Sequence, residues 1–174
     1  METYIKAKIS LRYAKNEIIN CGKSHKGKLF FQNNMKSFSS ILTKTNREKP
    51  INDAIRFTVV VDNILDYYDV CQHYTNTLRT FKVTNHWLNL SRAYNGYHIN
   101  ALTICNFPYE VQIHTERSQY WRDNEQSRKL YLLSKKALDN ESYILYFIIQ
   151  ILLYILSSNV FFQSLLIKFM FNYR

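Results

Sequence analysis

A nearly unbroken apolar run, AIRFTVVV (Ala54–Val61), limits the folds that are open to this 174-residue chain. Its β-branched and aromatic residues predict a strand that lies inside a sheet and is covered on both faces. Asp62 and Asn63 end the strand, and apolar residues in the following segment Leu65–Thr80 recur every three to four positions, which predicts a helix. A buried strand followed at once by a helix is typical of domains that combine a sheet with helices on its faces.

The rest of the chain up to Lys136 continues this alternation. Alternating apolar residues predict strands in Phe81–Leu90 and His98–Ile104, and again in PYEVQIHT (Pro108–Thr115). Helices are predicted over residues 1–20, before the first strand, and over Arg117–Lys136, after the last. This order implies an α/β (α+β) fold, a mixed β-sheet flanked by helices.

The composition excludes several kinds of site. The chain has three Gly and two Pro, so it has no Gly-rich loop of the P-loop or dinucleotide-binding kind. Cys21, Cys71 and Cys105 lie far apart without CxxC spacing, which predicts free thiols in a reducing compartment rather than a zinc site or a disulfide framework. The N-terminus has no continuous apolar stretch of the signal-peptide kind, and a cytoplasmic location is predicted.

Positive charge is concentrated near the N-terminus. The net charge is +10, and eleven Lys and Arg against three Glu place +8 of it in residues 1–49. This excess favours a polyanionic partner, whether nucleotide phosphates, RNA or an anionic membrane surface. A solvated basic face is the alternative explanation.

A long uncharged segment, Tyr143–Ile167, differs in kind from the rest of the chain. It meets the length criterion for a membrane span, although Gln150 and the run Ser157–Asn159 interrupt it. Three interpretations stay open: a membrane-associated helix, a buried or oligomerising helix, or a tail that is foreign to the domain. The predicted division is a basic helix and loop over 1–30, a central domain over 31–138, and a hydrophobic tail helix over 139–174.

Polar residues share one face of the predicted strand Pro108–Thr115. Because residues i and i+2 of a strand project to the same face, Glu110, Gln112 and His114 line one surface while Val111 and Ile113 enter the core. A carboxylate beside an amide and an imidazole can activate a hydroxyl or hold Mg²⁺ against phosphates. A strand with a polar solvent face would show the same pattern.

Two further groups of residues suit a bound polyphosphate. Asp53 could ligate Mg²⁺ at the start of the first strand, and Arg56 could clamp phosphate oxygens. Lys36, Ser40 and Lys44 recur every four positions in a predicted short helix or turn, so two ammonium groups and a hydroxyl would line one side of it. Ordinary surface helices and strand ends carry the same residue types.

The tripeptide Asn95-Gly96-Tyr97 precedes the strand at His98. Gly96 permits an unusual backbone angle, and the ring of Tyr97 could be exposed for stacking on a base. The alternative is a turn whose tyrosine packs on the sheet. A second loop is predicted for the polar residues 21–28.

In this order, KSxxSIxxK, DAIRF, NGY, EVQIHT and a charged helix resemble the synthetase domain of the RelA/SpoT family, which includes small alarmone synthetases and toxin-like members. The resemblance covers about residues 30–135 and implies a nucleotidyltransferase-like fold. It implies transfer of the β,γ-pyrophosphate of ATP to the 3′-hydroxyl of GDP or GTP, with Mg²⁺ as cofactor and AMP and (p)ppGpp as products. It also implies a homo-oligomer.

The resemblance assigns roles to the residues that match its motifs. Asp53 would hold Mg²⁺, Glu110 would either help to bind it or accept the proton of the hydroxyl, and Gln112 would orient the acceptor. The other residues would bind the nucleotides: Arg56, Lys36, Lys44 and Ser40 the phosphates, Tyr97 the acceptor base, and Asn95 and His114 the rest of the pocket.

Four positions depart from the family pattern. Asn34 stands in place of an ATP-stacking arginine, and the glycine usual between the aspartate and arginine of the first strand is missing. Ala101 replaces a family histidine, for which His98 or Asn100 could substitute, and His114 stands where many members have arginine. Three alternatives therefore stay open: a non-catalytic module, a toxin-like enzyme that modifies another nucleotide or the 3′ end of tRNA, and a basic protein that acts at a membrane through its tail.

Overall fold

A five-stranded mixed sheet forms the centre of the protein in the computed structural model, with the strand order β1-β2-β5-β4-β3. The central strands β2 (Arg56–Val61) and β5 (Pro108–Thr115) are parallel. β1 (Gly27–Phe30), β4 (Tyr97–Leu102) and β3 (Thr80–Asn85) each run antiparallel to the strand they join. The structure describes residues 1–23, 27–31, 34–47, 50–88, 95–123, 129, 132–133, 148 and 166–172.

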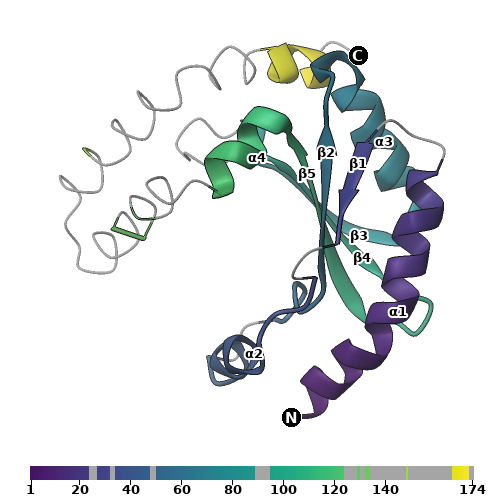
Figure 1. The fold of residues 1–174 in the computed structure, drawn as a ribbon, viewed down its shortest axis with the longest axis vertical. Coiled ribbons are helices and arrows are strands. Elements are labelled where there is room, and N and C mark those ends of the chain that lie inside the picture. The colour runs from purple at the N-terminus through teal and green to yellow at the C-terminus, as the bar shows by residue number, and fades with distance from the viewer. Residues whose placement is uncertain are drawn as a thin grey trace.

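Four helices surround the strands in this part of the chain. α1 (Glu2–Gly22) and α3 (Tyr67–Thr77) lie on one side of the sheet in Figure 1. α2 (Phe38–Thr45) and α4 (Glu116–Asp123) lie towards the other side, near opposite ends of β2 and β5. The predicted mixed sheet with flanking helices is confirmed.

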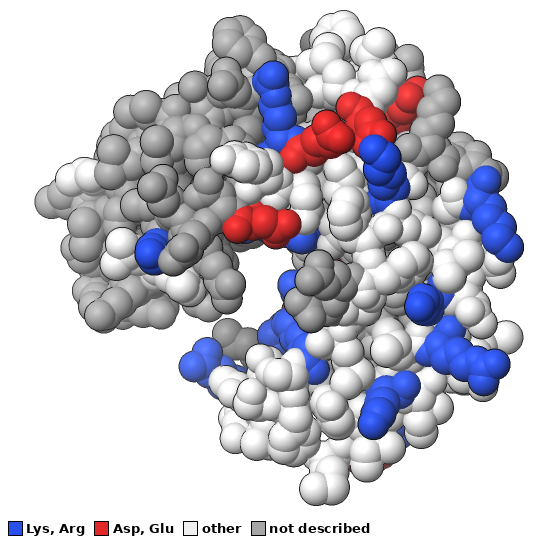
Figure 2. Space-filling view, viewed as in Figure 1, with Lys and Arg blue, Asp and Glu red and all other residues white. Residues whose placement is uncertain are grey.

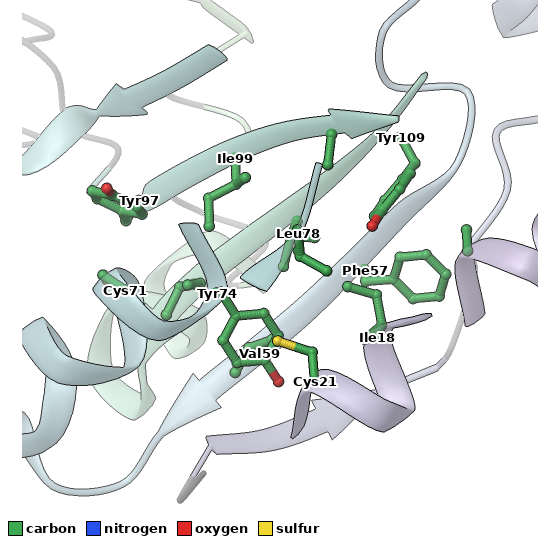
Figure 3. Close-up of a cluster of buried hydrophobic side chains, with 14 of the residues drawn as sticks. Ile18, Cys21, Phe57, Val59, Cys71, Tyr74, Leu78, Tyr97, Ile99 and Tyr109 are labelled. Carbon is green, nitrogen blue, oxygen red and sulfur yellow. The ribbon is translucent and has the colours of Figure 1, made fainter. Parts of the chain in front are cut away.

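The core lies between the sheet and the pair α1 and α3. Alternate residues of β2, β4 and β5 enter it, and they meet Ile18 and Cys21 of α1 and Tyr74 of α3 (Figure 3). Because strand residues alternate between faces, the intervening residues of the same strands carry the polar side chains on the opposite face. The strand residues in the core are Phe57, Val59, Val61, Tyr97, Ile99, Ala101, Tyr109, Val111 and Ile113.

Two predicted segments were wrong at their ends. Residues 27 and 28, at the end of the loop predicted over 21–28, belong to the edge strand β1, which was missed because Gly27–Phe30 is too short to show a period. The strand predicted over Phe81–Leu90 ends at Asn85, whose side chain accepts a hydrogen bond from the Trp87 amide at 3.1 Å and so starts a turn of 3₁₀ helix, His86–Leu88.

This 3₁₀ turn is fixed to the sheet by a buried hydrogen-bond chain. The indole Nε1 of Trp87 donates to the hydroxyl of Tyr67 at 2.8 Å, and that hydroxyl donates to the carbonyl of Ile113 at 2.7 Å. The chain joins the N-terminus of α3 to the middle of β5 without leaving these polar atoms unpaired. A second 3₁₀ turn, Ile64–Asp66, leads into α3.

The helical residues 166–172 pack on the domain. Ile167 is fully buried in the core. The ring of Phe171 stacks on Tyr97 with centroids 5.4 Å apart and meets Tyr68 at 5.0 Å. These contacts join residues 166–172 to the core of the domain.

Other predictions for the C-terminal part fall outside the described residues. This holds for Tyr143–Ile167 except for residues 148, 166 and 167, and for most of the helix predicted beyond Asp123. Among the helices that are described, none combines the length and apolarity that a membrane crossing requires.

Candidate functional site

The sheet face away from α1 and α3 carries the predicted polar residues. Figure 2 shows the molecule hollowed between α2 and the region of α4, with Lys and Arg side chains along the edge next to α2. Backbone pairing sets the geometry, because Arg56 of β2 lies directly opposite Glu110 of β5, and Thr58 lies opposite Gln112.

Asp53 lies within a cluster of three cations. Its Oδ1 pairs with Lys44 Nζ at 2.8 Å, and its Oδ2 pairs with Arg56 Nη2 at 3.1 Å and with Lys36 Nζ. Burial acts to raise the pKa of Asp53, but the hydrogen bonds and charges of Lys36 and Lys44 outweigh it and lower the pKa below its usual value. The side chain is 16% exposed and stays ionised at neutral pH.

The segment before α2 holds both lysines over Asp53. The Lys36 amide donates to the carbonyl of Ala54 at 2.9 Å, so the segment runs beside the start of β2. Ser37 then caps α2 by accepting from the Ser40 amide at 3.3 Å, and the helix brings Lys44 back to Asp53 two turns later. The Ser40 hydroxyl itself lies on the exposed side, 2.9 Å from the Ser37 hydroxyl.

Glu110 is a buried carboxylate, 6% exposed. His98 Nδ1 lies 2.8 Å from its Oε1, Gln112 Nε2 donates to the same oxygen at 2.8 Å, and Arg56 Nε lies 3.4 Å from its Oε2. Burial acts to raise the pKa of Glu110, yet the His98 hydrogen bond and the charge of Arg56 together lower it to about 2. Glu110 is therefore fully ionised on this face.

One guanidinium joins the two carboxylates. Arg56 Nη2 contacts Asp53 and Arg56 Nε contacts Glu110, so both acids lie on the same face of the sheet. Arg56 Nε is buried and has no hydrogen bond within the described part of the chain, because its distance from Glu110 exceeds that of a well-formed bond. Arg56 therefore lies between the two acids and pairs with both.

Asp53 and Glu110 are the carboxylates on this face that could hold a Mg²⁺ ion arriving with a nucleotide. Mg²⁺ is usually held by one or two carboxylates together with substrate phosphates and water. All four carboxylate oxygens are engaged by Lys, Arg, His or Gln side chains. In the described residues no group of three or more His, Cys, Asp or Glu could hold a resident metal ion.

Arg122 of α4 lies on this face and was not selected in the sequence analysis. Its Nη1 donates to Gln112 Oε1 at 3.0 Å and to Thr58 Oγ1 at 3.1 Å, and lies 3.5 Å from His114 Nε2. No spacing within α4 indicates this contact, because it depends on how the helix is placed against the sheet.

His114 is enclosed rather than available to a ligand. It is fully buried, its Nδ1 lies 3.1 Å from the Ser118 hydroxyl, and Asn95 contributes a backbone hydrogen bond to it. Gly96 is needed for space, because a Cβ there would lie 2.8 Å from the imidazole Cε1. The unusual backbone angle expected at Gly96 is wrong, since no described glycine has a positive φ.

Acid should destabilise the protein through His114. Burial, followed by the charges of Arg122 and His98, lowers the pKa of His114 well below 6.5. As the pH falls below 6.5, the unfolded chain binds a proton at this residue that the folded protein does not. The resulting loss of stability is up to about 1.4 kcal/mol per pH unit. Urea unfolding at pH 7.5, 6.5 and 5.5 measures this slope, and His114→Gln should make it shallower. An unchanged slope in the variant would contradict the prediction.

Tyr97 lies on the core face, which differs from the exposed ring expected from NGY. It lies two residues before Ile99 in β4, so both side chains project to the same face, and it is 5% exposed. Its hydroxyl lies 3.1 Å from Thr75 Oγ1, and its ring stacks on Phe171 (Figure 3 shows it within the buried cluster). The alternative, a tyrosine packed on the sheet, describes this position.

Tyr97→Leu should therefore lower stability and leave nucleotide affinity intact. Loss of the ring contact and of the Thr75 hydrogen bond should cost about 1–3 kcal/mol in free energy of unfolding, measured by denaturant titration. A ring that stacked on a base would instead be worth about 1–3 kcal/mol of binding, or roughly tenfold or more in Kd. A selective loss of guanine nucleotide affinity in a stable variant would show that Tyr97 turns outward.

Two departures from the family motifs have structural explanations. Asn34 exchanges hydrogen bonds with Arg56, accepting from its amide at 2.7 Å and donating to its carbonyl at 2.8 Å, so it supports β2. Ala101 is fully buried on the core face. His98 lies on the polar face against Glu110 and is the described histidine that contacts this acid.

Neither a protein-family model nor a curated protein matches this sequence. Solved structures do. The type VI effector Tas1, in complex with its immunity protein, has a TM-score of 0.58 at 20% identity, over 72% of this chain and 66% of that chain. Small alarmone synthetase 1 of Bacillus subtilis has a TM-score of 0.57 at 16% identity, over 95% and 92%.

A third match is small alarmone synthetase 1 of the same organism bound to its product pppGpp, with a TM-score of 0.55 at 15% identity over 91% of each chain. The chain therefore has the fold of the RelA/SpoT-like synthetase domains. It spans about two thirds of the Tas1 chain and nearly all of the synthetase chains.

Proposed function

We propose that this chain is a nucleotide pyrophosphokinase that transfers the β,γ-pyrophosphate of ATP to the 3′-hydroxyl of GDP or GTP, giving AMP and ppGpp or pppGpp. The observation that carries the proposal is the bridge that Arg56 makes between Asp53 and Glu110 on one open face, beside Lys36 and Lys44. The shared fold supports it, since one protein with that fold binds pppGpp as its product.

The charge of the site supports a polyphosphate ligand. Four cations, Lys36, Lys44, Arg56 and Arg122, face two ionised acids, Asp53 and Glu110. The excess positive charge suits a substrate that brings several negative charges. Catalysis of phosphoryl-type transfer consists mostly of positioning and of neutralising such charge.

Each side chain would act as follows. Lys36, Lys44 and Arg56 exchange their contacts with Asp53 for the β- and γ-phosphates. Asp53 and Glu110 would hold a Mg²⁺ ion that arrives with ATP, and the ion would supply further charge neutralisation. The acceptor oxygen bonds to the β-phosphorus, the bond from that phosphorus to the α,β-bridging oxygen breaks, and AMP leaves with that oxygen.

Glu110 would act more as an anchor than as a strong base. A carboxylate with a pKa of about 2 binds protons weakly. It can still accept a hydrogen bond from the 3′-hydroxyl and pass the proton to water as the new bond forms. In a loose transition state the hydroxyl needs to lose its proton only late in the reaction. Gln112, hydrogen-bonded to Glu110, would orient the acceptor.

The direct test is transfer of label from [γ-³²P]ATP to GDP or GTP by the full-length chain, resolved by chromatography. Full-length protein is needed because Ile167 belongs to the core. Labelled ppGpp or pppGpp that depends on Mg²⁺ would establish the activity. Intact ATP binding without transfer to any acceptor would instead identify a non-catalytic module.

A second candidate is an effector-like transferase with a different acceptor. Two observations favour it: the likeness to Tas1, and the inward position of Tyr97, which removes the base-stacking ring expected for a guanine nucleotide. ADP, ATP and tRNA as acceptors in the same assay separate the candidates. Label in an adenine nucleotide or in tRNA, with none in GDP or GTP, would favour the second.

A further inference from the structure

The guanidinium of Arg122 is held in place at the α4 end of the polar face. Nη1 is fixed by Thr58 and Gln112, which are 8% and 4% exposed, and Nε pairs with Asp123 at 3.1 Å. The Arg122 side chain is 25% exposed. A planar guanidinium held at two of its nitrogens is oriented before any ligand arrives.

The charge of Arg122 is poorly compensated. Its acidic partner in the described structure is Asp123, which is 60% exposed and therefore well solvated. Nη2 makes no hydrogen bond or ion pair to any described residue. Arg56, by contrast, pairs with two carboxylates. As far as the described residues go, Arg122 thus has a donor edge without a partner and a positive charge.

Glu110 lies between Arg122 and the cation cluster around Asp53. Along β5, Glu110 comes first, then Gln112 and then His114, with about 7 Å between successive same-face residues. Arg122 contacts the last two of these positions, and Arg56 contacts the first. The face therefore carries two separate cationic regions with the acid between them.

A two-substrate reaction at Glu110 would use both regions. A triphosphate on Lys36, Lys44 and Arg56 would repel a second polyphosphate placed on the same cations. An acceptor whose hydroxyl reaches Glu110 from the other side keeps its own phosphates away from the donor.

We propose that Arg122, supported by Thr58 and Gln112, forms a second anion subsite that takes the 5′-phosphate groups of the acceptor nucleotide. The identity of the acceptor rests on the proposed function. The contact is a charge-assisted hydrogen bond from a guanidinium to phosphate oxygens, the kind of pair for which arginine is best suited.

Isothermal titration of the full-length chain with GDP and with guanosine tests this subsite without requiring turnover. Wild type should bind GDP more tightly than guanosine. Arg122→Gln should weaken GDP binding about tenfold or more and leave guanosine binding unchanged. Arg122→Lys should recover part of the loss, because it keeps the charge but not the fork. Arg117→Gln, an exposed arginine on the same helix, should have no effect.

Three results would overturn the subsite: no GDP binding by wild type, equal weakening of GDP and guanosine by Arg122→Gln, or a loss confined to the ATP analogue AMPCPP. Melting temperatures show whether a variant is folded, and Arg122→Lys replaces Arg122→Gln in the test if Arg122→Gln does not fold.

The two proposals fail differently. An Arg122-dependent preference for GDP in a chain without transferase activity keeps the subsite and removes the enzyme, whereas transfer that is indifferent to Arg122 does the reverse.

Discussion

Replacement of Glu110 by glutamine should lower pyrophosphate transfer by about a hundredfold or more, the size of effect seen when a charge-positioning group is removed from an active site. Glu110 accepts hydrogen bonds from His98 and Gln112, and the charge of Arg56 lies 3.4 Å from its Oε2. An amide brings its own NH₂ group, which cannot accept any of these bonds, and it removes the negative charge next to Arg56. Both the acceptor position and the charge balance of the site should change.

The comparison needs a stability measurement beside the assay. A buried charge left without its partner costs about 1–3 kcal/mol or more, so part of the lost activity could reflect unfolding. Thermal melts show whether the variant is folded at the assay temperature, so that activity lost to unfolding can be separated from activity lost at the site. Glu116→Gln, the same chemical change at an exposed position of α4, is the matched control. Transfer by Glu110→Gln within threefold of wild type would remove Glu110 from the proposed mechanism.

Asp53→Asn should separate nucleotide binding from turnover. The change removes one acid from among Lys36, Lys44 and Arg56 and leaves all three cations in place. We expect metal-free AMPCPP to bind at least as tightly as in wild type, because the phosphates no longer compete with a carboxylate. Transfer should fall by about a hundredfold or more, because one of two proposed Mg²⁺ ligands is missing.

Titrations of AMPCPP with and without Mg²⁺ test this pair of expectations. In wild type Mg²⁺ should tighten AMPCPP binding, and in Asp53→Asn it should do so less. Asp62→Asn, which loses a more exposed ion pair with Lys28, is the matched control. If metal-free binding by Asp53→Asn falls in step with transfer, Asp53 acts mainly by holding the lysines in place and the Mg²⁺ role is wrong.

The sequence predicted most of the sheet because local chemistry determines it. The run of β-branched residues in β2 and the alternation in PYEVQIHT are strong enough to identify both central strands. β1 was missed because four residues cannot show a period, and β3 was drawn too long because the side-chain hydrogen bond at Asn85 has no signature in hydropathy.

Several of the residues that meet on the polar face were selected from the sequence, but the contacts that join them were not. Asp53 and Glu110 are 57 positions apart, and what joins them is the parallel register that sets Arg56 opposite Glu110. No spacing in the sequence gives that register. Arg122 was missed for the same reason, since its contacts depend on the packing of a helix. The position of Tyr97 could have been predicted. It lies two residues before the core residue Ile99 in the same strand, so both side chains lie on the core face.

The packing of residues 166–172 also bears on how the protein is made. Ile167 belongs to the core and Phe171 packs against it, and both meet residues that are synthesised long before them, including Tyr68 and Tyr97. During translation the nascent domain must therefore keep an apolar surface exposed until residues 166–172 leave the ribosome. Chaperone dependence and sensitivity to proteases at that stage should follow from this late closure.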